Sequence, residues 1–447
     1  MIIFRLALRS LRHRPASFAA SFVSLFLGAT ILMTFASLLD TRANVDESTG
    51  RILTIMASAV GGWGLVLVVV AVMSTLGLLV RQRDTELALL KSIGATPAQI
   101  GKLIVGEAVS IAIVAFLAAI TPAVFTGRLV VGLLKNAQRL PERVPAEFGP
   151  FAISIGLGIT LLAAAIAAAA TAWRRARIGV REGLLTASIG DARPGRVRLV
   201  AGVLVLATGI SAGVLTATVF TGREPALMAV GGQGAILSAV GFALLAPSLL
   251  AAITRAAAKP LRRTGASGYL AVLNLHGQTQ QLAGALVPNI LFTGMATGTL
   301  YMQSIENSAA TGARTEIARS IETLNYVVVG MVALFAAIML VNTLIATTIH
   351  RRREFGQQRL VGSTPPQVLG MVGLEGAVLA STGVLFGSIA SVATVVPYSL
   401  VKTGSVLPHA TITIYLGVVL IACALTLASS VGTARQAIRV PAVQACR

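Results

Sequence analysis

The sequence predicts an all-α polytopic membrane protein with ten transmembrane helices, arranged as two parallel four-helix repeats joined by a two-helix hairpin. Three observations support this fold class. The chain is 55% hydrophobic and only 12% charged, whereas globular domains carry about 25% charged residues. Continuous apolar runs recur along the chain, which favours helices over a barrel, because barrel strands alternate apolar and polar residues. A block of residues also occurs twice, at a constant offset of 268 positions.

The apolar runs define the predicted spans. A bilayer core of about 30 Å needs about 20 apolar residues in each helical span. Ten runs meet this requirement, at residues 16–38, 53–80, 103–126, 150–173, 198–220, 228–253, 282–304, 323–349, 369–396 and 411–434. The first run is longer than twenty residues, which fits a retained span better than a cleaved signal peptide.

The net charge of +20 is distributed unevenly along the chain. If the N-terminus is cytoplasmic, 26 of the 36 Lys and Arg residues lie in inside segments and 10 lie outside. Basic residues in short loops on one side set the orientation of a membrane protein, and they also meet anionic headgroups. We therefore expect both termini in the cytoplasm. We also expect the basic residues to contact membrane lipids rather than nucleic acid.

The two halves of the chain begin alike. Phe4–Arg12 has apolar residues on one side and arginines on the other, the pattern of a helix that lies in the membrane interface. Its counterpart, Tyr269–Leu275, lies just before the seventh span. The predicted repeats are residues 1–185 and 265–447, joined by a hairpin at 186–264. Because each repeat starts on the cytoplasmic side, the two are parallel and related by an axis along the membrane normal.

The duplicated block lies in the polar connections between spans 2 and 3 and between spans 8 and 9. Seven of its 25 positions are identical, and Lys91/Arg359 and Ile93/Val361 are conservative pairs. The identical residues are Arg83, Glu86, Gly94, Thr96, Pro97, Gln99 and Glu107 in the first copy, and Arg351, Glu354, Gly362, Thr364, Pro365, Gln367 and Glu375 in the second.

Each copy predicts a short helix, a sharp corner, and a new helix that becomes the next span. A glutamate lies in the first turn of the short helix, where the helix dipole favours it, and Gly94 or Gly362 follows its end. Thr96 or Thr364 is then an N-cap, followed by proline at the first helical position and by glutamine at N3, which completes a capping box. Such a corner would transmit force between a surface helix and two spans. A well-capped turn that survived gene duplication is the alternative.

The pattern R-x-x-E-x-x-x-x-[KR]-x-[IV]-G-[AS]-T-P-x-Q-[IV], followed by a glutamate, resembles the signature of FtsX-like permease domains, the membrane subunits of MacB-type ABC transporters. In that family this segment is the cytoplasmic coupling helix, which docks on the ATPase subunit. The resemblance covers residues 1–185 and 265–447. Family members usually have a glycine two residues after the first glutamate; Gly356 keeps it and Ala88 does not, so the first copy is expected to dock less typically.

The resemblance implies a set of coupling residues and a partner. The coupling residues are Arg83, Glu86, Lys91, Gly94, Thr96, Pro97 and Gln99, and Arg351, Glu354, Gly356, Arg359, Gly362, Thr364, Pro365 and Gln367. The sequence contains no G-x-x-x-x-G-K-[ST] pattern, so ATP and Mg²⁺ are expected on a separate subunit. Two coupling helices imply two ATPase copies. In the chain itself we expect no catalytic residue, no cofactor and no metal, since its four histidines and two cysteines share no metal-site spacing.

Glu107 and Glu375 fall near the cytoplasmic ends of spans 3 and 9. Ionisable residues within a membrane suggest function by default. Three interpretations stay open for these two acids: they orient or couple the helices, they are solvated acids at the membrane interface, or they couple proton movement.

The sequence thus predicts the permease subunit of an ABC transporter in the bacterial cytoplasmic membrane. Because the spans hold almost no buried charge, we expect a lipid, lipopeptide or antimicrobial peptide as the exported or extracted substrate. Many relatives carry a large extracytoplasmic domain, but the outside loops here are short, which counts against a periplasm-spanning assembly. Two alternatives stay open: a subunit that transmits ATPase motion to an external hydrolase without transport, and an ion-coupled secondary transporter.

Overall fold

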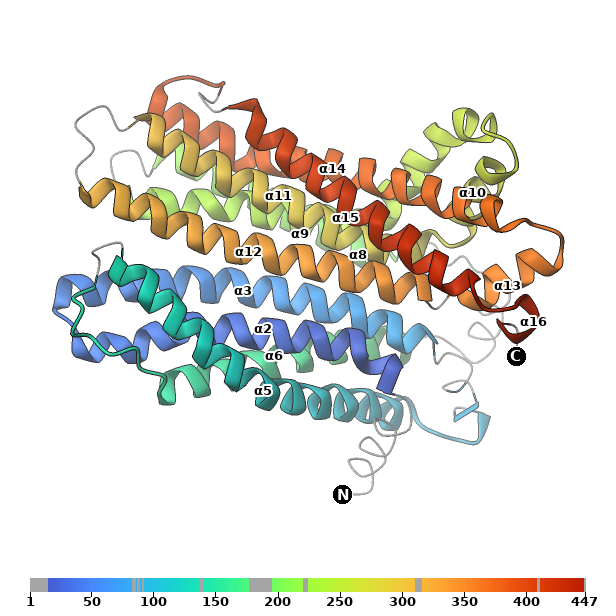
Figure 1. Ribbon diagram of the computed structural model, residues 1–447, viewed down its shortest axis with the longest axis horizontal. Helices are drawn as coiled ribbons and strands as arrows, with labels where there is room; N and C mark the ends of the chain where they lie inside the picture. The colour runs from blue at the N-terminus through green and yellow to red at the C-terminus, as the bar shows by residue number, and fades with distance from the viewer. Residues whose placement is uncertain are drawn as a thin grey trace. The chain divides into compact units, whose positions relative to one another are not determined.

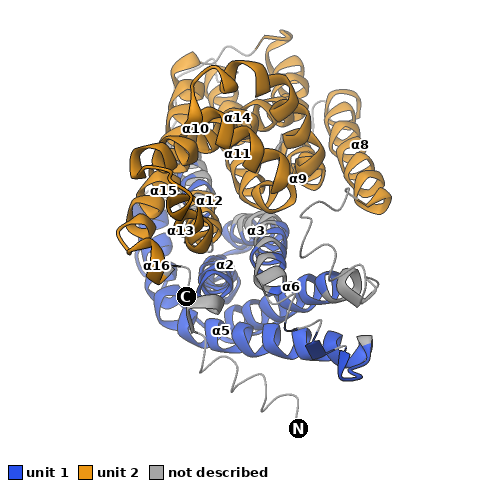
Figure 2. Ribbon diagram, turned by 90° about the vertical axis from the view of Figure 1, so that its right-hand side faces the viewer, with its two compact units in different colours: residues 1–189, 312–335 blue, residues 190–311, 336–447 orange. Residues whose placement is uncertain are grey.

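The structure is a computed structural model that describes residues 15–82, 86, 89–90, 92–136, 140–176, 195–219, 224–309, 316–349, 351–407 and 411–445. Every regular element in these residues is helical, as the fold class predicts (Figure 1). The predicted interfacial helix at Phe4–Arg12 and the coupling residues Arg83 and Lys91 lie outside the described residues. The chain divides into two compact units, residues 1–189 with 312–335, and residues 190–311 with 336–447 (Figure 2).

Eight helices in the described residues are long and apolar enough to cross a membrane, or nine if one bent pair counts as a single span. The eight are α2, α5, α6, α8, α9, α11, α14 and α15. Helices α3 and α12, of 36 and 34 residues, cover the two remaining predicted spans. The protein is therefore a multi-pass helical membrane protein, and the count of ten spans stays a prediction.

Unit 1 contains a bundle of four long helices in which α2 packs against each of the others. They are α2 (Pro15–Thr41), α3 (Glu47–Gln82), α5 (Pro97–Asn136) and α6 (Pro150–Ala176), with a short 3-10 helix, η1 (Arg42–Asn44), after α2. The first part of α12 (Glu316–Ile349) also belongs to this unit. Because α2 contacts three helices, nearly all of its residues between 31 and 41 are buried.

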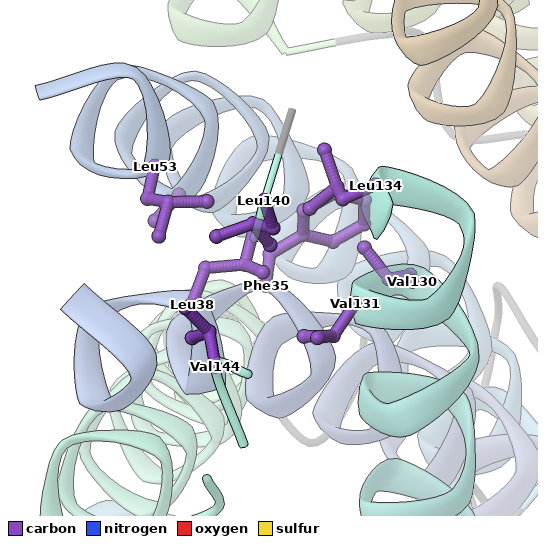
Figure 3. Packing of buried hydrophobic residues seen from close by; sticks show 9 residues of the cluster. Phe35, Leu38, Leu53, Val130, Val131, Leu134, Leu140 and Val144 are labelled. Atoms are coloured by element: carbon purple, nitrogen blue, oxygen red, sulfur yellow. The ribbon is translucent and has the colours of Figure 1, made fainter. Parts of the chain in front are cut away.

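An apolar core at one end of unit 1 extends α5 beyond the predicted span. Phe35 and Leu38 of α2 and Leu53 of α3 pack against apolar side chains of α5 and of the segment that follows it (Figure 3). The latter are Val130, Val131, Leu134, Leu140 and Val144. Phe35 is fully buried, and within a membrane such a side chain stabilises the bundle by van der Waals packing between helices. The helix therefore continues to Asn136, ten residues past the predicted end at 126.

The start of α6 is capped by a carboxylate from α2. Asp40 accepts hydrogen bonds from the backbone N–H groups of Phe151 (3.0 Å) and Ala152 (2.9 Å). The first N–H groups of a helix have no intrahelical acceptor and carry partial positive charge. Gly149 makes room for the contact, because a Cβ there would lie 2.6 Å from Asp40 Oδ1.

Substitution of Asp40 by alanine is expected to destabilise unit 1 by about 1–3 kcal/mol, because it leaves two backbone N–H groups without their acceptor. Thermal unfolding of the purified protein in detergent measures the loss. Glu47→Ala is the control: Glu47 forms an exposed ion pair with Arg51, and such pairs contribute about 0–1 kcal/mol. Equal losses for the two substitutions would contradict the capping role of Asp40.

Unit 2 is built around α14 (Pro365–Thr403), which packs against most of the other helices of the unit. The helices in contact with it are α8 (Arg196–Thr218), α9 (Glu224–Arg262), α10 (Ala266–Gly277), α11 (Thr279–Ala309), α13 (Arg352–Leu360) and α15 (Ile412–Ile438). The second part of α12 and the short α16 (Ala442–Ala445) complete the unit. At 1.5 Å per residue, the 39 residues of α14 span about 58 Å, well beyond a bilayer core of about 30 Å.

The predicted hairpin, α8 and α9, packs tightly within unit 2. A Cβ at Gly213 of α8 would lie 2.3 Å from the carbonyl oxygen of Ala393 in α14, so only glycine allows this approach. The hydroxyl of Thr394 donates to the carbonyl of Gly231 and accepts from the N–H of Ala235 (2.7 Å). It therefore contacts two backbone groups of α9 that lie one turn apart, and it joins α9 to α14.

The far ends of α11 and α14 are joined by a second polar contact. Glu306 of α11 accepts a hydrogen bond from the buried hydroxyl of Tyr398 (2.6 Å) and forms an ion pair with Lys402 (3.1 Å). Both partners are in α14. This contact fixes the two helices to each other at the end opposite the start of α14. The repeat boundaries at 185 and 265 stay a prediction, because the two units are defined by contacts and not by repetition.

Candidate functional site

Residues 351–367, the first part of the second copy of the duplicated block, form a helix, a corner and the start of a new helix, as predicted. We call these residues the second elbow. Helix α13 ends at Leu360, and Gly362 has a φ of +109°, a left-handed conformation that favours glycine. The N–H of Thr364 donates to Gln367 Oε1 (2.9 Å) in a capping box, and Pro365 begins α14. The sequence alone therefore specified this local geometry correctly.

The first elbow, residues 83–99, is described in part and shares this corner. Gly94 has a φ of +97°. The N–H of Thr96 donates to Gln99 Oε1 (2.8 Å), and the N–H of Gln99 donates to Thr96 Oγ1 (3.3 Å). Pro97 then begins α5. The two corners therefore have the same backbone turn and the same cap.

The second elbow is fixed by a buried cluster of three charged residues, Arg351, Glu354 and Glu375, which we call the Arg351 cluster. Arg351 donates to both oxygens of Glu354, at 3.0 and 3.1 Å, and to both oxygens of Glu375, one of them at 3.2 Å. The side chains of Arg351 and Glu375 are 5% and 2% exposed. The cluster thus joins the residue before α13, the first turn of α13 and the third turn of α14.

The mutual attraction within the cluster keeps its elbow residues charged. Burial alone would lower the pKa of the Arg351 guanidinium, but the carboxylates of Glu375 and Glu354 outweigh burial and raise that pKa above its ordinary value. Burial would also raise the pKa of Glu354, but its hydrogen bonds and charge interaction with Arg351 lower it below its ordinary value. The guanidinium also lies 5.2 Å from the ring centroid of Phe355, a cation–π distance.

Two amide side chains complete the cluster, that of Asn274 in α10 and that of Gln278 directly after α10. Neither residue is among those predicted from the sequence. Asn274 Nδ2 lies 3.0 Å from Glu354 Oε1 and 3.0 Å from Glu375 Oε1. Gln278 Nε2 donates to Glu354 Oε2 (2.9 Å). The available signal was the amide of Asn274 within the otherwise apolar stretch Tyr269–Leu275, but the sequence could not show that this stretch meets a glutamate 80 residues later.

The last turn of α13 is attached to the end of α15. Arg359 Nη1 donates to the carbonyl oxygens of Ile438 (2.8 Å) and Val440 (2.9 Å), at the end of that helix, where cations are favoured. Phe355 is 1% exposed and packs in a core with Met371 of α14 and other apolar residues of α10, α14 and α15. Gly356 is also buried. One face of α13 is therefore buried against neighbouring helices.

The tip of each elbow leaves a large aliphatic side chain exposed. Ile93 is 80% exposed and Val361 is 90% exposed. They occupy the same position in the duplicated block, directly before the glycine of positive φ. Leu89 and Leu360 nearby are also exposed, at 66% and 56%. In the sequence, Ile93 and Val361 are recognisable only as a conservative pair, because the pattern of a short polar connection does not indicate which of its side chains are exposed.

The other predicted site residues differ in their exposure to solvent. Glu107 is 4% exposed and Glu375 is 2% exposed. Glu86 is half-buried and Pro365 is exposed. Glu375 lies within the Arg351 cluster rather than in solvent, and the roles of the two buried acids stay a prediction.

Comparison with known families gives one result. The model of the FtsX-like permease C-terminal family matches residues 58–180 and 326–442, more than half of the chain. The chain belongs to the FtsX-like permease family. Each matched region of this permease contains one elbow. Members of the family are membrane components of ABC-type systems that normally work with an ATPase subunit and are generally not catalytic themselves. A search of curated proteins found no match.

Proposed function

We propose that this permease couples ATP hydrolysis by two copies of a separate ABC ATPase to the export or extraction of a hydrophobic or amphipathic substrate. Each elbow docks on one ATPase copy, which binds the ATP and Mg²⁺. The observation that carries the proposal is the pair of exposed aliphatic tips, Ile93 and Val361, at equivalent positions of a duplicated corner. Exposed apolar side chains that cluster mark protein interaction sites, and each tip is accompanied in the same elbow by an exposed leucine, Leu89 or Leu360.

The second elbow is suited to pass on a displacement. Helix α13 is attached on its buried face through the Arg351 cluster, Phe355 and Arg359. Helix α14 then continues without a break from Pro365 to Thr403. A movement applied at Val361 would therefore reach the far end of α14, where Lys402 and Tyr398 contact Glu306.

The distribution of buried charge supports an apolar or amphipathic substrate. Among the described residues, the buried acidic and basic side chains are Asp40, Glu107, Arg351 and Glu375. Each lies within about three turns of a helix end, so none marks a hydrophilic path at mid-membrane depth. A lipid, lipopeptide or antimicrobial peptide is the proposed substrate class. The concentration of Lys and Arg in one set of connections supports a bacterial cytoplasmic membrane location with both termini in the cytoplasm.

Substitution of the exposed tips by aspartate tests the docking role. We expect Val361→Asp to reduce co-purification of the ATPase, and Ile93→Asp together with Val361→Asp to abolish it, because a charge would have to be desolvated in an apolar contact. The measurement is the amount of ATPase retained by tagged permease in detergent after co-expression with ABC ATPases from the same genome.

The matched control is Leu407→Asp. Leu407 is 78% exposed and follows α14, at the end opposite the elbow. It is expected to leave both ATPase binding and membrane insertion unchanged. ATPase retention by the doubly substituted permease at the level of the unmodified protein would refute docking through the elbow tips.

A further inference from the structure

We propose that Asn274 and Gln278 are positioning residues that hold α10 to the second elbow, so that α10, α13 and the start of α14 move as one body. The inference rests on the proposed coupling function and adds a second route for the motion. Helix α10 ends at Gly277 and α11 begins at Thr279. A displacement of the elbow would therefore reach α14 directly and α11 through α10.

Asn274 repeats, from α10, the connection that Arg351 makes. Within the described contacts, these two side chains are the ones that donate to both Glu354 and Glu375. Hydrogen bonds to ionised acceptors are shorter and stronger than neutral ones. The amide of Asn274 also lies 3.2 Å from Met371 Sδ, a much weaker acceptor than either carboxylate. The carboxylates are therefore its effective partners.

Gln278 lies four residues after Asn274, on the same side of the end of α10. Its backbone N–H donates to the carbonyl of Asn274 (2.8 Å), and its side chain donates to Glu354 (2.9 Å). Both amides therefore act on Glu354, a residue of α13. The last turn of α10 is therefore held against α13, the helix that directly precedes the exposed tip, Val361.

A separate contact fixes the other end of α10 on α14. Ser267 Oγ donates to the carbonyl oxygen of Gln367 (3.0 Å), in the first turn of α14. The absence of a side chain at Gly370 allows this approach, since a Cβ there would lie 2.9 Å from Ser267 Oγ. Helix α10 thus runs beside the first turns of α14, from Ser267 at one end to Asn274 at the other. It cannot slide along α14 without breaking one of these contacts.

The burial of α11 shows why a second route matters. Of the most apolar 18-residue stretch of α11, 94% is buried inside the protein. Helix α11 is joined to α14 at the far end through Glu306. If the elbow moved α14 alone, the closely packed pair would have to shear. Movement of α10 with the elbow displaces both helices together.

The test measures the separation of α10 and α13 with and without the two amides. Spin labels are placed at the exposed positions Tyr269→Cys in α10 and Gln357→Cys in α13, with Cys423 and Cys446 replaced by serine. In the labelled reference protein we expect one narrow distance distribution that ATP does not change in the ATPase-bound complex. In Asn274→Leu/Gln278→Leu we expect a wider distribution in the isolated permease, and a further shift when ATP is added to the complex.

Control variants distinguish loss of the contact between α10 and α13 from general destabilisation. Asn289→Leu removes a buried amide of α11 that does not contact the elbow, and we expect it to leave the distribution narrow. Asn274→Gln keeps a donor and should restore most of the narrow distribution in the presence of native Gln278. If the double variant does not fold, Gln278→Leu alone is measured, with the same widening expected to a smaller degree.

A distribution that stays narrow and independent of ATP in the amide variants would overturn the inference. The measurement on the isolated permease needs no ATPase, so it decides whether the amides hold α10 to α13 even if no ATPase binds. Failure of ATPase binding in the unmodified protein would instead count against the proposed function. The two failures are therefore distinguishable.

Discussion

Replacement of Arg351 by leucine is expected to lower the free energy of unfolding by about 3–5 kcal/mol, the largest loss for any single residue of the second elbow. The substitution leaves the carboxylates of Glu354 and Glu375 close together without their common guanidinium. Glu375 is 2% exposed, so water cannot replace the lost partner. Helix α13 should then detach from α14, and coupling to the ATPase should fail with it.

Thermal unfolding in detergent measures the stability loss, and ATPase stimulation in the complex measures coupling. Arg352→Leu is the matched control, because Arg352 is the next residue in the chain and is exposed. Arg351→Lys should lose part of the stability, since lysine keeps the charge but not the fork that bonds two carboxylates. Combining Arg351→Leu with Glu354→Gln and Glu375→Gln should recover most of it. A loss for Arg351→Leu no greater than that for Arg352→Leu would show that the cluster contributes little.

The duplicated block allowed the members of this cluster to be selected from the sequence, but not their contacts. Arg351, Glu354 and Glu375 stand out in the sequence because each recurs at the same offset in the first copy of the block. The capping box and the glycine corner followed from local rules, and both are present. Residues 351 and 375 meet because the chain reverses at Gly362, which a sequence pattern can indicate. The contribution of Asn274 depends on how α10 packs, which no local rule provides.

The spans show the same division between local and tertiary information. Eight of the ten predicted spans lie wholly within one helix, and the spans 198–220 and 411–434 overlap nearly all of α8 and most of α15, because hydropathy reports the part of the chain that matches the hydrocarbon thickness. Helix ends depend on caps and packing. Helix α9 runs from Glu224 to Arg262, against a predicted span of 228–253. Helix α14 continues to Thr403, against a predicted end at 396, and is followed by Gly404 with a φ of +67°. The predictions were therefore too short at the ends of the longest helices.

Gly387→Ala is expected to destabilise the contact between α11 and α14 by about 1–3 kcal/mol, the cost of overpacking a close contact. A Cβ at position 387 would lie 2.6 Å from the Cβ of Thr293, 2.9 Å from the carbonyl oxygen of Ile290 and 3.0 Å from the N–H nitrogen of Gly294. Two of these three atoms are backbone, so they cannot rotate away. One helix would have to move, although both are fixed to each other at their far ends through Glu306.

Gly417→Ala in α15 provides the control, because no atom beyond the neighbouring backbone of α15 lies within 4 Å of the added Cβ at that position. There the methyl group should raise stability by about 0.5–1 kcal/mol, since glycine is less favourable than alanine in a helix interior. The same substitution should therefore have opposite signs in two helices of one unit. Thermal unfolding in detergent compares them directly. Stabilisation by Gly387→Ala would mean that α11 and α14 are not in close backbone contact, and that a displacement of α14 by the elbow need not move α11.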